Sequence, residues 1–149
     1  MPEEKLPLEL KLGLRAGSVF YFQAREMLSA QPHFFVVVNS NPLRDELLLL
    51  TVFTSQIDKV RQRNRERPET VVEFGPADFA PLDQPTAVDA NVIVRRSLSE
   101  MVDLVRRKEI GYHPDLSLDL LSRIRTALLS SPVIEDEDKD LIRGGATNA

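Results

Sequence analysis

Two apolar stretches decide the fold of this chain: HFFVVVNSNP, from His33 to Pro42, and LLLLTVFTS, from Leu47 to Ser55. Both are short runs of β-branched, aromatic and aliphatic residues bounded by turn formers, which is the pattern of buried strands. We expect them to pair antiparallel across the turn between them. The start of the first strand and the end of the second then lie at the same end of the hairpin. His33, Thr54 and Ser55 would share one rim of a small barrel, and they form the candidate site.

Length and composition predict one domain with a core of its own. The chain has 149 residues, of which 42% are hydrophobic and 28% charged, as in ordinary globular proteins. It lacks cysteine, which excludes disulfides and thiolate zinc sites. With only two histidines, we expect no metal site and no cofactor. No apolar run approaches the roughly 18 residues that a membrane span needs, and the charged N-terminal segment is unlike a signal peptide. These features predict a cytoplasmic protein that does not bind membranes.

The charge is unevenly distributed along the chain. The segment from Glu135 onward holds five acidic and two basic residues, so it carries most of the net charge of -4. We therefore expect one domain over residues 1–134 and an acidic, disordered tail over 135–149. Basic residues alternate along Arg61–Arg67, in a polar segment without periodicity that predicts an exposed connection over Gln56–Arg67. Such a loop could follow an RNA backbone, or it could simply be solvated.

Strand patterns come first in the chain and helix patterns follow. Strands are expected over Gly17–Phe22, the two stretches above, Thr70–Phe74 and an extended segment Thr86–Arg95, and an alternation at Leu6–Leu12 could add an edge strand. The capping-box pattern Ser97-x-x-Glu100 begins a helix that ends near Lys108. A second helix is expected over Leu118–Ser130, and Tyr112–Pro114 is expected to be a connector between the helices. This order predicts an α+β, mainly β domain with a curled antiparallel sheet and a helix packed on it.

Four features in this order carry a resemblance to a known family. They are Gly17 followed by a strand, a Val-Val strand entered from a loop, a strand ending in Thr-Ser, and the segment Asp83-Gln84-Pro85-x-x-x-Asp89 followed by a helical region and an amphipathic helix. Over residues 15–131 the chain resembles a divergent member of the MazF/PemK-like toxins. That resemblance implies the small, curled SH3-like barrel of the CcdB/MazF type with a C-terminal amphipathic helix.

The resemblance also implies a function. Proteins of this kind are typically toxins of type II toxin–antitoxin modules. They cut single-stranded RNA without a metal, are blocked by an antitoxin protein and commonly form homodimers. The reaction is in-line attack of a ribose 2′-OH on the adjacent phosphorus, which needs a base, an acid and donors to the phosphorane oxygens.

The chain departs from the typical pattern where the second strand opens. His33 stands where the typical member has Arg followed by Pro, and Ala80-Pro81-Leu82 stands where a second arginine is common. Histidine has an unperturbed pKa near 6.5 and can act as base or acid, so we assign that role to His33 and phosphate binding to Thr54 and Ser55. We assign RNA binding to five arginines, which supply positive charge, and to one further hydroxyl. These residues are Arg25, Arg61, Arg63, Arg65, Arg67 and Thr86.

A second interpretation stays open from sequence. The absent arginines favour a non-catalytic, toxin-like barrel that binds a protein or nucleic acid, whereas the histidine and the Thr-Ser pair favour an endoribonuclease. Each site residue also has a structural interpretation. His33 could only bond to backbone, and Thr54 and Ser55 could only cap the end of their strand.

Overall fold

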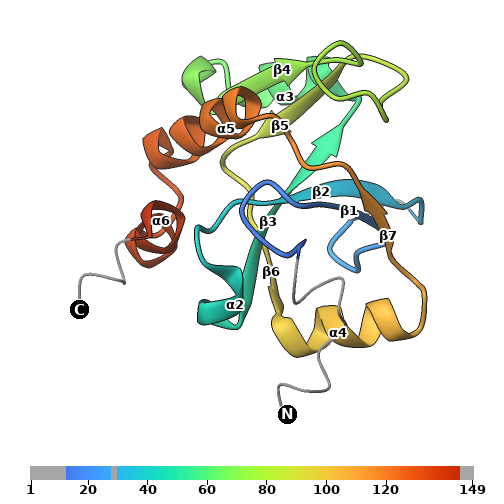
Figure 1. The fold of residues 1–149 in the computed structure, drawn as a ribbon. Coiled ribbons are helices and arrows are strands. Elements are labelled where there is room, and N and C mark those ends of the chain that lie inside the picture. Colours follow the sequence, from blue (N-terminus) through green and yellow to red (C-terminus); the bar gives the residue numbers. More distant parts are fainter. Residues whose placement is uncertain (1–12, 28–29, 145–149) are drawn as a thin grey trace.

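The computed structural model describes residues 13–27 and 30–144, with residues 111 and 112 described by their backbone alone. The expected edge strand at Leu6–Leu12 lies outside these ranges. The strands are β1 (Val19–Phe22), β2 (His33–Val37), β3 (Leu47–Thr54), β4 (Val71–Phe74), β5 (Thr86–Asp89), β6 (Val94–Ser97) and β7 (Gly111–His113). The helices are α2 (Pro42–Asp45), α3 (Ile57–Arg63), the 3₁₀ turn η2 (Pro68–Thr70), α4 (Leu98–Arg106), α5 (Leu118–Ser130) and α6 (Asp136–Arg143) (Figure 1).

All strand pairs are antiparallel, and β3 is the centre of the sheet. The strands lie in the order β4-β5-β3-β2-β1-β7, and β6 pairs with β3 off this path. One edge of β3 pairs with β2, and the other edge pairs first with β6 and then with β5. In the described part of the chain β4 and β7 are the two ends of the sheet, so the sheet is open. The expected α+β, mainly β architecture with an antiparallel sheet is confirmed.

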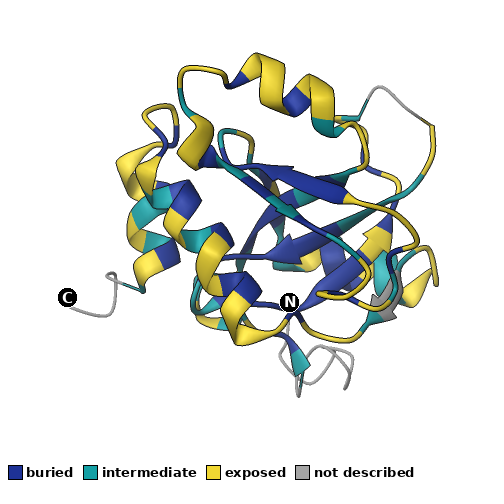
Figure 2. Ribbon diagram, turned by 90° about the horizontal axis from the view of Figure 1, so that it is seen from above, coloured by how far each residue is buried: buried dark blue, intermediate teal, exposed yellow. Residues whose placement is uncertain are grey.

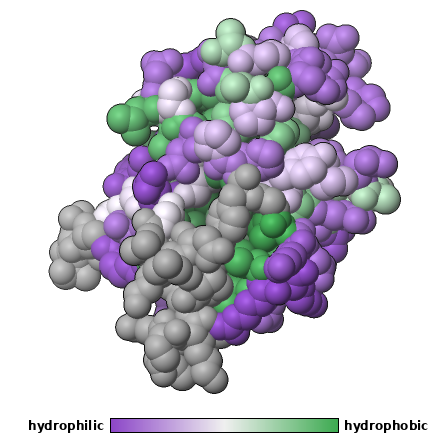
Figure 3. Space-filling model, turned by 45° about the vertical axis from the view of Figure 1, so that its right-hand side comes forward, coloured by the Kyte–Doolittle hydropathy of each residue, from purple (hydrophilic) through white to green (hydrophobic). Residues whose placement is uncertain are grey.

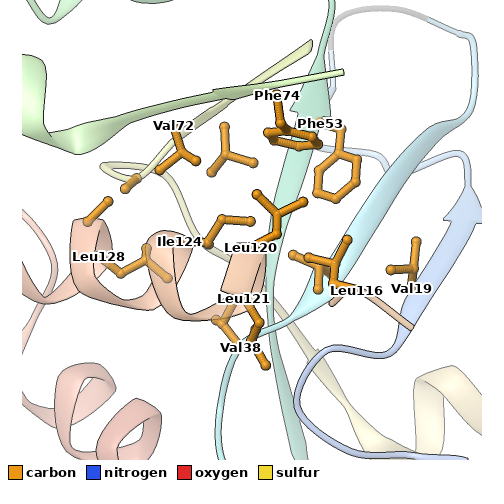
Figure 4. Close-up of a cluster of buried hydrophobic side chains, with 14 of the residues drawn as sticks. Val19, Val38, Phe53, Val72, Phe74, Leu116, Leu120, Leu121, Ile124 and Leu128 are labelled. Atoms are coloured by element: carbon orange, nitrogen blue, oxygen red, sulfur yellow. The ribbon is translucent and has the colours of Figure 1, made fainter. Parts of the chain in front are cut away.

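The two faces of the sheet bury two separate hydrophobic cores. Alternation along β2 sends Val36 into the first core and Phe35 and Val37 into the second. In the first core, helix α5 packs against side chains of β3 and β4 (Figure 4). In the second core, helix α4 contributes Met101 and Val102. The strands are therefore mostly buried between elements whose outer surfaces are exposed (Figure 2).

Both long helices begin at the residues that the sequence indicates. Ser97 Oγ accepts a hydrogen bond from the backbone N–H of Glu100, and the Glu100 carboxylate accepts one from the backbone N–H of Ser97, at 3.2 and 3.1 Å. This is a complete capping box. Ser117 Oγ likewise accepts from the backbone N–H of Leu120 at 3.2 Å. The expected helices at Leu118–Ser130 and after Ser97 are confirmed.

The segment Gln56–Arg67 is mostly exposed, as the sequence predicts, but part of this connection is helical. Residues Ile57–Arg63 form helix α3, although Val60 alone among them is buried. A short helix that buries one side chain has no apolar periodicity, so the pattern could not reveal it. The expected connector at Tyr112–Pro114 is also wrong in part, because strand β7 pairs there with β1.

The expected extended segment Thr86–Arg95 divides into two strands. A turn separates β5 from β6, and the carboxylate of Asp89 accepts a hydrogen bond from the backbone N–H of Asn91 at 3.0 Å. This bond is an Asx-type turn contact. The division lets β5 and β6 pair with different halves of β3.

The expected disordered tail is wrong for its first half, because Asp136–Arg143 forms helix α6. Ile142 is fully buried in the first core, and Asp138 pairs with Arg95 of β6 at 2.5 Å. Arg125 of α5 donates to the Ile142 carbonyl and to Ser40 Oγ, and burial lowers the pKa of Arg125. A cation at the C-terminal end of a helix is also favoured by the helix dipole. The acidic composition of this segment is typical of disorder, although the segment forms a helix that packs on the first core. No helix in the described ranges is both long and apolar enough to cross a bilayer.

One buried hydroxyl provides a test of the core. Thr51 of β3 is fully buried opposite Val36, and its Oγ1 has no hydrogen-bond partner within the described ranges. We expect Thr51→Val to raise the free energy of unfolding by about 1 kcal/mol, because an unpaired buried hydroxyl is lost at nearly constant shape. Urea denaturation measures this change. The matched control is Thr70→Val, which is expected to destabilise, because the fully buried Thr70 donates to the Arg67 carbonyl and accepts from Asn91.

Candidate functional site

The register of the central strands places His33 and Thr54 at the same end of the hairpin. The antiparallel β2–β3 ladder ends with Phe35 opposite Val52. His33, two residues before Phe35, and Thr54, two residues after Val52, therefore lie at the same end of the hairpin and on the same face of the sheet. Both side chains point to the face of the sheet that carries the second core, as Phe35 does. The two residues therefore form a shared rim, as the hairpin pattern in the sequence predicts.

The rim continues across neighbouring strands. His33 pairs with Phe22 of β1, Thr54 pairs with Ala87 of β5, and Ala87 pairs with Glu73 of β4. These residues form one row on one face of the sheet. The row ends at Glu73, whose carboxylate receives two hydrogen bonds from Arg61 of α3, at 2.6 and 2.7 Å. Sequence reasoning missed Glu73, although its place between apolar residues of a short strand is a signal that it faces away from the first core.

The ring of His33 is only partly engaged by the protein. Its Nδ1 atom is shielded from solvent and has no hydrogen-bond partner within the described ranges. That leaves Nε2 as the ring nitrogen that can meet a substrate. Thr54 Oγ1 accepts a hydrogen bond from the backbone N–H of Gln56 at 3.1 Å, which holds the start of α3, and its hydroxyl hydrogen stays available. Ser55 follows the last residue of β3 and is exposed.

A groove adjoins this rim on the side of β1. It has a volume of about 680 Å³ and lies between the end of β1 and the end of α4, where it is lined by Phe22, Arg25, Pro32, Leu104 and Lys108, among others. A second hollow of about 210 Å³ shares Phe22, Arg25 and Leu104 with it. On this side of the molecule, a recess of hydrophobic side chains lies among mostly hydrophilic ones (Figure 3). Arg25 is thus a cation that lines this groove, together with Pro32, the residue before His33.

Three of the arginines assigned to RNA binding contact carboxylates, and the exposed Arg25 reaches Glu100 at 3.4 Å. Arg61 pairs with Glu73, and Arg63 donates to Asp89 from two nitrogens at 3.1 and 2.9 Å. The Arg61 hydrogen bonds hold the pKa of Glu73 below its ordinary value. Burial acts to raise the pKa of Asp89, but hydrogen bonds from Arg63 and Asn91 outweigh it, so that pKa is lowered. Both carboxylates are therefore ionised at neutral pH and neutralise the two arginines.

The other assigned residues differ in their surroundings. Arg65 is exposed after the end of α3, whereas the Nε atom of Arg67 is buried without a hydrogen-bond partner in the described part of the chain. Thr86 is buried, and its hydroxyl donates to the Gln84 carbonyl at 3.0 Å. The structure thus places His33 and Thr54 at the same end of the hairpin, and Arg25 in a groove that Pro32 also lines. Thr86 lies on the opposite face of the sheet from Ala87, the partner of Thr54.

No cluster suited to a metal ion is present in the described ranges. There, no three or more histidine, aspartate or glutamate side chains converge as ligands. The chemistry that these residues offer is that of an imidazole, hydroxyls and guanidinium groups. Such groups transfer protons, donate hydrogen bonds and neutralise anionic oxygens.

Comparisons with known proteins bear on the fold. No protein-family model matches the chain, and no curated protein matches it in sequence. A chain matches in a solved structure described as an endoribonuclease in complex with its cognate antitoxin from a mycobacterial species. The match has a TM-score of 0.50 and 20% sequence identity, and it covers 79% of this chain and 93% of that chain. A likeness at this identity supports the fold, a small α+β, mainly β architecture.

Proposed function

We propose that this protein is a metal-independent endoribonuclease that cuts single-stranded RNA, as the toxin of a type II toxin–antitoxin module. The observation that carries the proposal is the placement of His33 and Thr54 at one end of the β2–β3 hairpin, near the groove that Arg25 and Pro32 line. An imidazole, a hydroxyl and a cation are the groups that RNA transesterification requires. The likeness of the fold to a chain of an endoribonuclease–antitoxin complex adds support.

Each of these groups can take part in the reaction. The 2′-oxygen attacks the adjacent phosphorus, the O2′–P bond forms and the P–O5′ bond breaks. The products are a 2′,3′-cyclic phosphate and a 5′-hydroxyl. His33 takes the proton of the 2′-OH or supplies the proton of the leaving 5′-oxygen through Nε2. Thr54 and Ser55 donate to the phosphate oxygens, and Arg25 neutralises the charge that develops on them.

Two protein partners belong to the same proposal. One is an antitoxin that covers the rim and the groove, and the other is a second copy of this chain in a homodimer. Arg65, and not the carboxylate-bound Arg61 and Arg63, supplies further contacts with the RNA backbone. An RNA contact by Arg61 or Arg63 requires the exchange of a carboxylate for a phosphate.

Cleavage of a long single-stranded RNA by the purified protein in EDTA tests this function. We expect cleavage to persist in EDTA and the new 3′ ends to carry a 2′,3′-cyclic phosphate, because the attacking nucleophile is the 2′-OH. An RNA with 2′-deoxy substitutions at the cleavage sites should resist. Cleavage that requires a divalent cation, or that leaves 3′-hydroxyl ends, would contradict the proposal.

A binding function without catalysis is the second candidate. The engagement of Arg61 and Arg63 by Glu73 and Asp89 favours it, because it removes two of the cations that would stabilise a transition state. Binding of single-stranded RNA without any cleavage, across RNAs of diverse sequence, would support this candidate over the first.

A further inference from the structure

A buried cation lies on the same face of the sheet as the rim. Arg96 of β6 pairs in register with Leu48 of β3 and is only 3% exposed. Its neighbour Val94, two residues earlier on the same face, belongs to the second core. A guanidinium in such surroundings requires a carboxylate partner, since burial of an unpaired charge is costly.

The partner of Arg96 comes from the loop between β1 and β2. The two terminal nitrogens of Arg96 donate to the two carboxylate oxygens of Glu26, at 2.5 and 2.6 Å. The Arg96 hydrogen bonds hold the pKa of Glu26 below its ordinary value, so the carboxylate stays ionised at neutral pH. This is the bidentate geometry that makes arginine–carboxylate pairs both strong and directional.

Two further contacts fix the same part of the loop. Ala24 is buried in the second core, and Arg25 reaches Glu100 at 3.4 Å. The Arg25 side chain is 71% exposed in that long contact, whereas the Glu26 pair is short. The backbone of Arg25 is thus held between two anchors, while its guanidinium can exchange Glu100 for another anion.

We propose that the Glu26–Arg96 pair is a positioning element that holds the β1–β2 loop against β6 and thereby keeps Arg25 in the lining of the groove near the start of β2. The proposal rests on the proposed function, because it names what presents the substrate-binding cation of that site. A purely stabilising role explains the pair less well, since buried ion pairs stabilise a fold no better than apolar side chains of similar size.

Arg96→Met separates positioning from stability. Methionine fills the buried space, and Glu26, which is 37% exposed in the pair, can return to water. We expect the midpoint of thermal unfolding to stay the same or rise. We also expect amide hydrogen exchange of residues 23–27 to become faster, and RNA cleavage to fall on the order of tenfold to 100-fold because a substrate-binding group is displaced.

The matched control is Arg95→Met on the same strand. Arg95 pairs with the largely buried Asp138 of α6, so its loss should lower thermal stability while exchange at residues 23–27 and RNA cleavage stay at wild-type levels. We therefore expect opposite results: Arg96→Met changes hydrogen exchange and RNA cleavage but does not lower thermal stability, and Arg95→Met lowers only thermal stability. Arg96→Lys, which keeps the charge without the fork, should restore part of the cleavage.

The exchange and cleavage measurements test the positioning role and the proposed function separately. Unchanged exchange at residues 23–27 in Arg96→Met would overturn the positioning role, whatever the protein does to RNA. Faster exchange with unchanged cleavage would also overturn it. A wild-type protein that neither cuts nor binds RNA would overturn the proposed function and the role of the pair in it, while the exchange data would still decide whether the pair holds the loop.

Discussion

Replacement of His33 by alanine is expected to slow RNA cleavage by about 10²- to 10⁴-fold, which is the usual contribution of a general acid or base. His33 is the one imidazole on the face of the sheet that carries the rim, within the described ranges. In these ranges the Nδ1 atom of His33 makes no hydrogen bond. Removal of the ring therefore breaks no hydrogen bond at that atom. The variant should therefore keep the fold of the wild-type protein, which far-UV circular dichroism and thermal unfolding can check.

His113 offers the matched control for this variant. Its ring packs against Phe34 and Tyr21, with ring centroids 4.9 and 5.9 Å apart, on the opposite face of the sheet from His33. His113→Ala should leave the cleavage rate unchanged when both variants are assayed on the same RNA in EDTA. Equal losses in the two histidine variants, or a fully active His33→Ala protein, would place the reaction elsewhere.

The second large effect is expected at a buried polar network around Asn91. The side-chain amide of Asn91 donates to Asn64, Thr70 and Asp89 at 2.9–3.0 Å, and its carbonyl accepts from Ser131 at 2.5 Å. This one side chain joins the end of α3, the turn before β4, the β5–β6 turn and the end of α5. We expect Asn91→Ala to lower the free energy of unfolding by about 3 kcal/mol, because four buried polar side chains each lose a hydrogen bond at the same time.

Urea denaturation at neutral pH measures this loss. The control is Asn41→Ala, since Asn41 precedes α2 but its side chain makes no capping hydrogen bond, and the change should be within about 0.5 kcal/mol. Asn91→Ala and Asn41→Ala proteins of equal stability would show that the network contributes nothing.

Asp89 gives the same network a pH dependence. Its pKa is lower in the folded protein than the ordinary aspartate value. A carboxylate of this kind stabilises the fold fully above its unfolded-state pKa, near 4, and loses that contribution as the pH falls through the folded-state value. Asp89→Asn should therefore flatten the fall in stability below about pH 4, as measured by urea denaturation across pH. A parallel fall in both proteins would exclude Asp89 as a source of the acid sensitivity.

Local patterns in the sequence predicted the strands and helices that carry the rim. The aromatic and β-branched run at 33–38 and the aliphatic run at 47–54 each predict a strand. The short link between them sets the register of the pair. The same holds for the capping box at Ser97 and the apolar stripe of α5. Residues close together in the sequence specify these elements, so they can be predicted from one sequence without knowledge of the folded structure.

Other elements depend on contacts between distant segments and gave no local signal. Helices α3 and α6 each bury very few side chains, Val60 in α3 and mainly Ile142 in α6, and their polar composition is typical of loops. The Glu26–Arg96 pair joins residues 70 positions apart, and no spacing rule connects them. Arg61 and Arg63 looked like free cations for the same reason, since Glu73 and Asp89 approach them only in the folded chain.

The most direct test of the account is to map where RNA binds, by NMR titration of the labelled protein with a single-stranded RNA that carries 2′-fluoro groups. The missing 2′-OH prevents cleavage, so the complex persists during the measurement. We expect the largest chemical-shift changes at His33, Thr54, Ser55 and Arg25. Shift changes confined to the α5 side of the sheet, or none at all, would contradict this expectation.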